Sequence, residues 1–292
     1  MKLKNLALFF AVALLACISS FAQDTPIIYS YQTVNYPNDT FTQLLGINNN
    51  GVIAGYHGAS VNKGFTLVLP NVFTNENFPN SAQTQVIGIN NHGATAGFYI
   101  DQQGLTHSFT AHGSTFLKID EPGTPFNQSL GINDNFVTVG YFSTKADGSG
   151  PDTGYTHIPG GVFENFQIPN GFSVQTTGIN TAGSTCGFYV DANGVNHGWI
   201  VFGGNFRVLD YPASTGTQAL GLNNKGAVVG SYTDAGGNSH GFVYTISTKT
   251  FQSIDDPNGI GTTIVNGIND KGVLVGFYGT APINSGFVAT PQ

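Results

Sequence analysis

Short runs rich in apolar residues alternate with glycine- and asparagine-rich turns along most of the chain. The segment from Thr217 to Pro257 shows the pattern most clearly. Its apolar and β-branched residues predict four strands, at 218–222, 227–232, 240–246 and 251–255. Turn sequences separate these strands, and Pro257 ends the last one because proline cannot donate a hydrogen bond to a β-ladder. The segment therefore predicts one four-stranded β unit.

This unit is repeated six times. The first mark of the repeat is the triplet Gly-Ile-Asn, or Gly-Leu-Asn once, which begins at Gly46, Gly88, Gly131, Gly178, Gly221 and Gly267. The second mark is a polar residue two positions before a proline, and it recurs at Pro37, Pro79, Pro122, Pro169, Pro212 and Pro257. Because both marks stay in step at intervals of 42 to 47 residues, they indicate a true internal repeat.

The first turn of each unit has a clear physical basis. An asparagine at its start can bond its own backbone, and a glycine three residues later can adopt the left-handed conformation of a tight hairpin. Five units have that glycine, at Gly51, Gly93, Gly183, Gly226 and Gly272. The third unit has Phe136 instead. A bulky residue is strained in this conformation, so we expect a rebuilt turn in that unit.

The arrangement of the units predicts an all-β, six-bladed β-propeller with four strands per blade, forming a single domain over residues 27–292. Adjacent aromatic residues such as Phe98-Tyr99 point to opposite faces of a strand, so both faces of a unit need cover. The last unit ends after its third strand, and the segment 31–37 matches a fourth strand. We therefore expect the N-terminal strand to complete the last blade and close the ring.

The unit also resembles the bacterial extracellular HAF repeat family, named after a His-Ala-Phe triplet. The corresponding triplets here are His107-Ser108-Phe109, His197-Gly198-Trp199 and His240-Gly241-Phe242, while the other three units lack the histidine. The resemblance covers essentially the whole chain after residue 22. It implies a bacterial, extracytoplasmic repeat protein and brings no catalytic residues.

Residues 1–22 are expected to be a signal peptide. Lys2 and Lys4 precede the apolar run 6–18, and Ser20-Phe21-Ala22 offers a cleavage site before Gln23. The run is short for a membrane span, and no later segment is long enough for one. We expect a secreted or extracytoplasmic protein, in the periplasm or outside the cell. A lipoprotein signal ending at Cys17 is the less favoured alternative.

Charge and cysteine content narrow the possible partners. Without residues 1–22, seven Lys and Arg face sixteen Asp and Glu, a formal charge of −9. This excess of acidic over basic residues argues against nucleic acid or an anionic membrane as the partner. We expect a monomer that binds a polysaccharide or another extracellular protein. Cys186 is then the only cysteine, and the repeat places it among small apolar residues of the core.

No catalytic residue, metal site or cofactor is predicted. The histidines show no zinc-binding spacing, and His107, His197 and His240 are interpreted as polar residues that bond between strands. Asp101, Asp191 and Asp234 begin glycine-containing turns, which is ordinary turn chemistry, although such turns leave calcium binding as an alternative.

A set of glutamines is the most suggestive candidate for ligand binding. They stand three residues before the triplet, at Gln43, Gln85, Gln128, Gln175 and Gln218, and Ile264 breaks the set in the sixth unit. If the Gly-Ile-Asn strand is innermost, these amides gather at one mouth of the channel, with Asp120, Asp210 and Asp255 behind them. They would either hold a polar ligand or bridge adjacent blades, and bridging is the favoured interpretation.

These observations favour a non-catalytic binding module. One alternative is an extracellular polysaccharide-degrading hydrolase or lyase, for which Asp120, Asp210 and Asp255 are the available carboxylates. The other is a purely structural surface protein.

Overall fold

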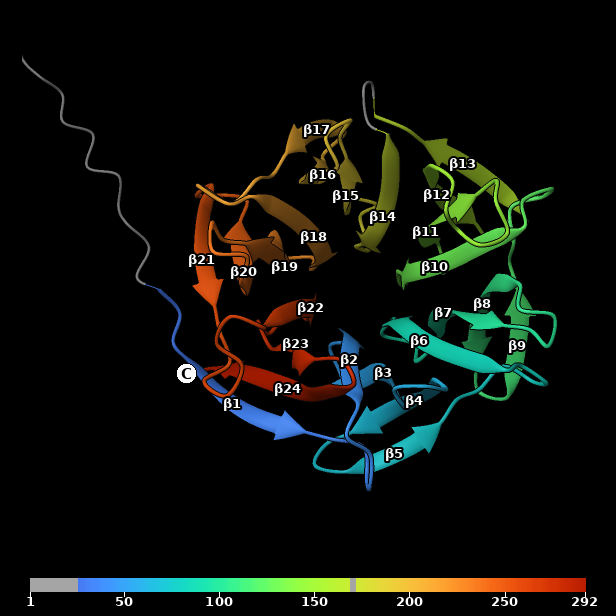
Figure 1. The fold of residues 1–292 in the computed structure, drawn as a ribbon, viewed down its shortest axis with the longest axis horizontal. Coiled ribbons are helices and arrows are strands. Elements are labelled where there is room, and N and C mark those ends of the chain that lie inside the picture. Colours follow the sequence, from blue (N-terminus) through green and yellow to red (C-terminus); the bar gives the residue numbers. More distant parts are fainter. Residues whose placement is uncertain (1–25, 169–171) are drawn as a thin grey trace, which may run out of the picture.

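The computed structural model describes residues 26–168 and 172–292, which form a ring of four-stranded antiparallel blades around a central axis (Figure 1). The predicted signal peptide and Cys17 lie outside the described residues. No helix long and apolar enough to cross a membrane occurs in the described part of the chain. The predicted all-β propeller is confirmed.

The six blades follow one another along the chain. Blade 1 consists of β2 (Thr42–Ile47), β3 (Val52–His57), β4 (Lys63–Val68) and β5 (Val72–Asn75). Blade 2 consists of β6 (Gln83–Ile89), β7 (Thr95–Ile100), β8 (Thr106–His112) and β9 (Thr115–Lys118). Blade 3 consists of β10 (Phe126–Ile132), β11 (Thr138–Ser143), β12 (Asp152–Ile158) and β13 (Val162–Phe166).

The second half of the ring has the same organisation. Blade 4 consists of β14 (Ser173–Ile179), β15 (Thr185–Val190), β16 (Asn196–Phe202) and β17 (Asn205–Val208). Blade 5 consists of β18 (Gly216–Leu222), β19 (Ala227–Thr233), β20 (Ser239–Thr245) and β21 (Thr250–Ile254). Blade 6 consists of β22 (Ile264–Ile268), β23 (Leu274–Thr280), β24 (Ile283–Pro291) and β1 (Tyr29–Val34).

The ring is closed by the N-terminal strand. β1 pairs antiparallel with β24, from Tyr29 opposite Pro291 to Val34 opposite Gly286, and so supplies the outer strand that the last repeat lacks. The Gly-Ile-Asn strands β2, β6, β10, β14, β18 and β22 lie nearest the axis (Figure 1). The sequence predicted both the closing strand and the inner position of these strands.

The hydrophobic core lies between the blades. The aromatic residue of each third strand, at the HAF-like triplet, is at most 1% exposed: Phe65, Phe109, Tyr155, Trp199, Phe242 and Phe287. Burying one such side chain contributes about 1.5–3 kcal/mol. Phe98 and Tyr99 are both buried although they point to opposite faces of β7, as the sequence predicted. Cys186 is also fully buried, and burial raises the pKa of its thiol to about 12.

The glycine of each triplet allows the inner strands to approach one another. The ladder register shifts at this residue, as between Leu44 and Gly46 in blade 1. A Cβ atom on Gly46 would lie 2.6 Å from the carbonyl oxygen of Ile87 in the next blade, and one on Gly221 would lie 2.6 Å from that of Asn266. A side chain there would push neighbouring blades apart.

The expectation of a rebuilt turn at Phe136 is wrong. Phe136 takes the left-handed conformation with φ +60°, and its N–H donates to Asn133 O at 3.0 Å, as Gly51 N–H does to Asn48 O at 3.1 Å. The turn therefore has the same form as in the other blades. Phe136 adopts a strained backbone conformation that a rebuilt turn would have avoided. Such strain costs on the order of 1–3 kcal/mol.

Replacing the inner-strand glycine should loosen the ring. We expect Gly221→Ala to lower the free energy of unfolding by about 2 kcal/mol, because the new Cβ must displace the backbone of blade 6. Gly216→Ala is the matched control in the same strand, since its Cβ would meet only atoms 3.7 Å or more away. Urea denaturation measures both changes, and equal stability of the two variants would contradict the close-approach argument.

Candidate ligand-binding cavity on the propeller axis

The predicted glutamine set converges on the axis. Gln43, Gln85, Gln128, Gln175 and Gln218 line one cavity of about 320 Å³ at the end where the inner strands begin. A second layer of side chains lies deeper along the same strands: Leu45, Ile87, Leu130, Thr177, Leu220 and Asn266. Rings from the second strands flank the cavity: Tyr56, Phe98, Phe188 and Phe277. We call this space the glutamine cavity.

Three of the glutamines bridge adjacent blades. The amide nitrogens of Gln43, Gln85 and Gln175 donate to Asn284 (3.3 Å), Asn62 (2.7 Å) and Asp152 (2.7 Å) of the preceding blade. The bridging interpretation of the sequence therefore holds at these positions. It does not exclude ligand binding, because a bridged amide still has a second polar atom.

The remaining amide atoms are available to a ligand. Tyr56 Oη donates to Gln43 Oε1 at 2.6 Å, so both polar atoms of Gln43 are engaged. Gln128 Oε1 accepts from Tyr141 Oη at 2.8 Å, which leaves its Nε2 without a partner among the residues described. Among the described residues, the Oε1 atoms of Gln85 and Gln175 also have no partner, and the Gln218 side chain makes no hydrogen bond. The cavity thus offers both donors and acceptors.

Blade 6 breaks the symmetry of the cavity. The sequence drew attention to Ile264, and the structure shows that blade 6 reverses the usual order of its polar and apolar side chains. Ile264 stands in the glutamine layer and Asn266 in the apolar layer. Asn266 Oδ1 is buried and has no hydrogen-bond partner within the described ranges. Sequence reasoning missed Asn266, although its alignment with Leu45 and Leu220 was a usable signal.

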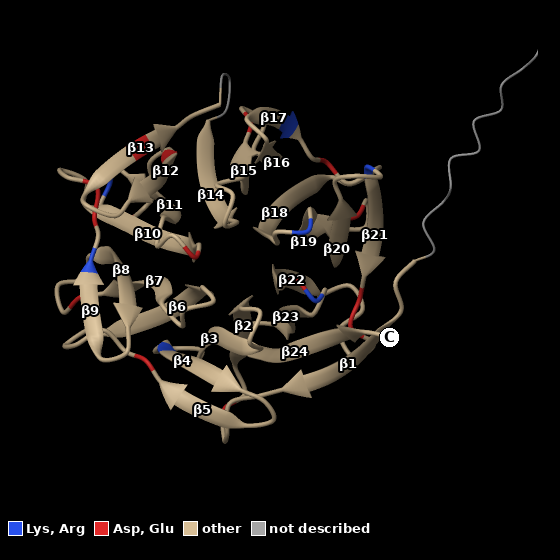
Figure 2. Cartoon of the chain, turned by 180° about the vertical axis from the view of Figure 1, so that it is seen from behind, with Lys and Arg blue, Asp and Glu red and all other residues tan. Residues whose placement is uncertain are grey.

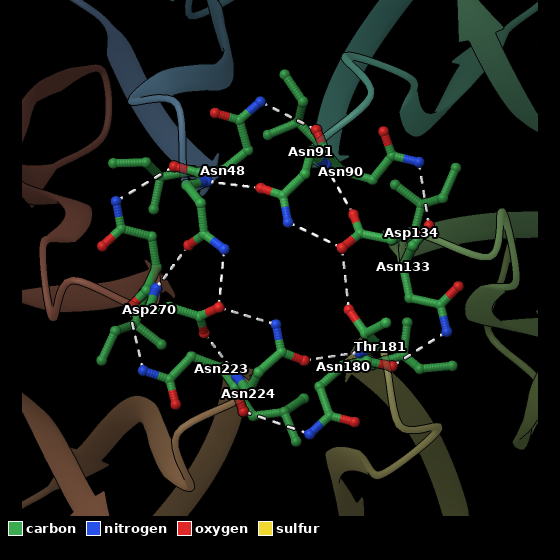
Figure 3. Close-up of a pocket in the computed structure, with 18 residues that line it drawn as sticks. Asn48, Asn90, Asn91, Asn133, Asp134, Asn180, Thr181, Asn223, Asn224 and Asp270 are labelled. Carbon is green, nitrogen blue, oxygen red and sulfur yellow. Dashed lines mark hydrogen bonds between the residues drawn. The ribbon is translucent and has the colours of Figure 1, made fainter.

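The opposite end of the axis is closed by asparagines (Figure 3). The Nδ2 of each triplet asparagine donates to the backbone oxygen of the same asparagine in the next blade. The bonds run from Asn48 to Asn90 (2.9 Å), Asn133 (3.0 Å), Asn180 (3.0 Å), Asn223 (3.3 Å), Asn269 (3.0 Å) and back to Asn48 (3.2 Å). This closed cycle of hydrogen bonds is the asparagine ring.

The side-chain oxygen of each triplet asparagine stabilises the hairpin in which that asparagine lies. Asn48 Oδ1 accepts the N–H groups of Asn50 and Val52, both at 3.0 Å. One side chain therefore fixes a turn and joins two blades. The sequence indicated the first role, whereas the second requires knowledge of how the blades are arranged.

Two carboxylates, Asp134 and Asp270, lie nearer the axis than the bonds of the asparagine ring (Figure 3). Asp270 Oδ2 accepts from Asn49 Nδ2 (2.7 Å) and Asn224 Nδ2 (3.0 Å), and Asp134 Oδ2 accepts from Asn91 and Thr181. Burial acts to raise the pKa of Asp270, but the hydrogen bonds from Asn224 and Asn49 outweigh it and lower the pKa below 3.8. The space at this mouth is about 70 Å³, so only the glutamine end can hold a ligand of substantial size.

The structure does not bring Asp120, Asp210 and Asp255 into the glutamine cavity. Each instead pairs with the histidine of its own blade: His107 with Asp120 at 2.6 Å, His197 with Asp210 at 2.9 Å and His240 with Asp255 at 2.9 Å. The interpretation of these histidines as residues that bond between strands is confirmed. Figure 2 shows that charged residues are sparse and scattered over the ring.

The aspartates of the second turns act on their own backbone. Asp101 Oδ1 accepts the N–H groups of Gln103 and Leu105, and Asp191 and Asp234 make equivalent bonds. Within residues 26–168 and 172–292, no group of three or more His, Cys, Asp or Glu is placed to hold a metal ion.

Solved structures with the same architecture come from unrelated sequences. A putative TolB from Agrobacterium tumefaciens has a TM-score of 0.60 at 12% identity, over 92% of this chain and 100% of that chain. AofleA from Arthrobotrys oligospora has a TM-score of 0.56 at 11% identity, over 87% and 84%. The Aleuria aurantia lectin, described as a six-bladed β-propeller with a novel mode of fucose recognition, has a TM-score of 0.51 at 9% identity, over 85% and 92%.

These similarities show the fold alone. No protein-family model matches the chain, and no curated protein is similar to it in sequence. The resemblance to the HAF repeat family therefore stays a prediction from the triplets.

The carboxylate of Asp270, beside the asparagine ring, should make the stability of the fold depend on pH. The lowered pKa of Asp270 means that its charged form stabilises the fold above about pH 4, and that this contribution is lost as the pH falls through the folded-state pKa. We expect Asp270→Asn to lower the free energy of unfolding by about 1 kcal/mol at pH 7 and by much less at pH 3. Urea titrations at both pH values measure the difference.

Glu164→Gln, at an exposed position of β13, is the control and should leave the pH dependence unchanged. An Asp270→Asn deficit that is equally large at pH 7 and pH 3 would show that the carboxylate charge is not the stabilising feature.

Proposed function

We propose that this protein is a non-catalytic binding module that holds a neutral saccharide unit in the glutamine cavity. The observation that carries the proposal is the composition of the cavity. Side-chain amides whose remaining donors and acceptors have no partner among the described residues stand over an apolar layer, in a space of about 320 Å³. Known small-ligand pockets begin at about 300 Å³ and combine apolar walls with a few fixed polar groups.

The chemistry of the cavity suits hydroxyl groups. An amide oxygen accepts from a hydroxyl and an amide N–H donates to one, so Gln85, Gln128 and Gln218 can bond a polyol in either sense. The apolar C–H surface of a sugar ring can contact the leucine and isoleucine layer. Asn266 also lines one side of that layer, so its amide would favour one orientation of the ligand.

None of the residues that line the cavity carries a charge at neutral pH, and the Asp152 carboxylate lies behind Gln175, which donates to it. Tyr56 is the one titratable residue among those that line it, and burial raises its pKa to about 12. Hydrolysis of a glycosidic bond requires a pair of carboxyl groups or an equivalent acid and base, and neither is present there. An uncharged cavity also favours a neutral ligand over a polyanion. These features support binding rather than catalysis.

A lectin of the same fold and the features of the sequence both support this proposal. One lectin of the same fold is described as recognising fucose, which supports a saccharide as the class of ligand. The predicted signal peptide 1–22 and the resemblance to HAF repeats are consistent with a protein that meets polysaccharide outside the cytoplasm.

Calorimetric titration with methyl glycosides of neutral sugars, methyl α-L-fucoside among them, tests the proposal. Gln218→Ile is the variant of choice, because Gln218 makes no side-chain bond to the described residues and blade 6 has isoleucine at the same position. Losing two hydrogen bonds to the sugar should weaken binding about tenfold, which corresponds to about 1.4 kcal/mol.

The control is Gln103→Ile, at an exposed position of a turn, which should bind as the unaltered protein does. Equal affinity of the Gln218→Ile variant would exclude the glutamine cavity as the site. Release of fragments from a neutral polysaccharide would instead identify an enzyme.

A further inference from the structure

A groove of about 610 Å³ lies between blades 2 and 3, separate from the axial cavity. Its apolar walls include Leu117, Ile132, Phe136 and Phe163, and its polar groups include Thr110 and His157. The turns that carry Phe136 and Gly160-Gly161 follow β10 and β12, on the side of the ring where the inner strands end. The groove therefore opens on the face opposite the glutamine cavity.

The groove lies beside a small apolar cluster between these two blades. Among the described residues, this cluster consists of Ala94, Ala96 and Ile132. The cluster between blades 4 and 5 contains eight buried residues, including Ile200 and Phe242. Blades 1, 2 and 3 have threonine (Thr66, Thr110 and Thr156) where blade 4 has Ile200, so the groove has a polar residue at this position of blade 2.

Phe136 combines a strained backbone conformation with a partly exposed side chain. It holds φ +60° where the other five blades have glycine, and its side chain is 42% exposed, so burial does not compensate for the strain. Its ring stacks on His92 with the ring centroids 5.6 Å apart and meets His112 edge-on at 6.2 Å. A strained and exposed aromatic residue beside a groove is more typical of binding sites than of structural turns.

His157 is a buried polar residue that faces the same groove. Equivalent positions in other blades hold apolar residues such as Leu67 and Val201. Its side chain is 8% exposed, and Nδ1 has one long contact, 3.5 Å to Thr138 Oγ1. Nε2 has no hydrogen-bond partner among the described residues. Burial lowers the pKa of His157, so the ring is neutral at pH 7 and can either donate or accept.

We infer that this groove is a second binding site for a neutral saccharide, in which the rings of Phe136 and Phe163 contact the apolar face of the sugar and His157 Nε2 bonds a hydroxyl. Thr110 Oγ1 offers a second polar contact. Lys118 and Asp120, at the rim, form an ion pair at 3.0 Å, so the groove presents no net charge that would favour an ionic ligand. The inference does not depend on whether the glutamine cavity binds a sugar.

The imidazole signals of His157 in nuclear magnetic resonance spectra provide a local test, because no histidine lines the glutamine cavity. The His157→Leu variant, which carries the residue of blade 1, assigns the His157 signals by their disappearance. The probes are methyl glycosides and disaccharides of neutral sugars. We expect at least one probe to shift the His157 signals in a saturable manner.

Phe136→Gly restores the residue of the other five blades, so this variant should fold well and be more stable than the unaltered protein. We expect it to weaken the binding that shifts His157 at least tenfold. Phe206→Ala is the control, because Phe206 is also 42% exposed but lies in blade 4. Gln218→Ile should leave the His157 shifts unchanged, which separates the two sites.

Two results would overturn the inference. If no neutral saccharide shifts the His157 signals, the groove is not a saccharide site, even if sugars bind to the glutamine cavity. If indole or phenol shifts them while the saccharides do not, the groove accepts an aromatic side chain of a protein partner instead. If the Gln218→Ile variant loses sugar binding in the glutamine cavity while the His157 signals still shift, the result would support both sites.

Discussion

The hydrogen bond from one triplet asparagine to the next is the interaction on which the rest of the structure depends. Each asparagine side chain accepts from its own hairpin and donates to the neighbouring blade, so every blade is fixed in conformation and in position by the same residue. The bond from Asn269 to Asn48 joins the last blade to the first, which makes the cycle complete. Because the donors and acceptors are buried, losing one of them costs more than losing an exposed bond.

The asparagine ring also explains why the two ends of the axis differ. The triplet glycines bring the inner strands together near the asparagines. The space between the strands there has a volume of only about 80 Å³. Toward the start of the strands, the longer glutamine and leucine side chains surround a wider cavity. The asparagine end of the inner strands therefore holds the ring closed. The residues at the glutamine end can differ between blades without opening the ring. Ile264 and Asn266 lie at the end that is free to vary.

The sequence predicted the blades, the closing strand and the convergence of the glutamines, because each follows from features that recur in step along the chain. It could not predict contacts between blades, such as Asn48 to Asn90, since these depend on how the units pack. The turn at Phe136 was predicted to be rebuilt because only the local backbone strain was considered. Two hydrogen bonds of the Asn133 side chain, to Asn180 O and from Val137 N–H, hold that turn in place. The groove beside His157 is lined by residues of two different blades, and no single repeat reveals it.

The charged residues of the repeat are best understood as structural. Each of Asp120, Asp210 and Asp255 is engaged by a histidine of its own blade, and the axial cavity is left with amides and apolar side chains. This distribution is suited to recognising hydroxyl groups and gives little scope for acid–base chemistry.

A crystal structure of the protein with a neutral methyl glycoside that it binds would test the central claim most directly. The account predicts a sugar ring in the glutamine cavity, with hydroxyl groups within hydrogen-bond distance of Gln218 and Gln128. An empty glutamine cavity in a crystal that holds the sugar elsewhere on the protein would contradict it.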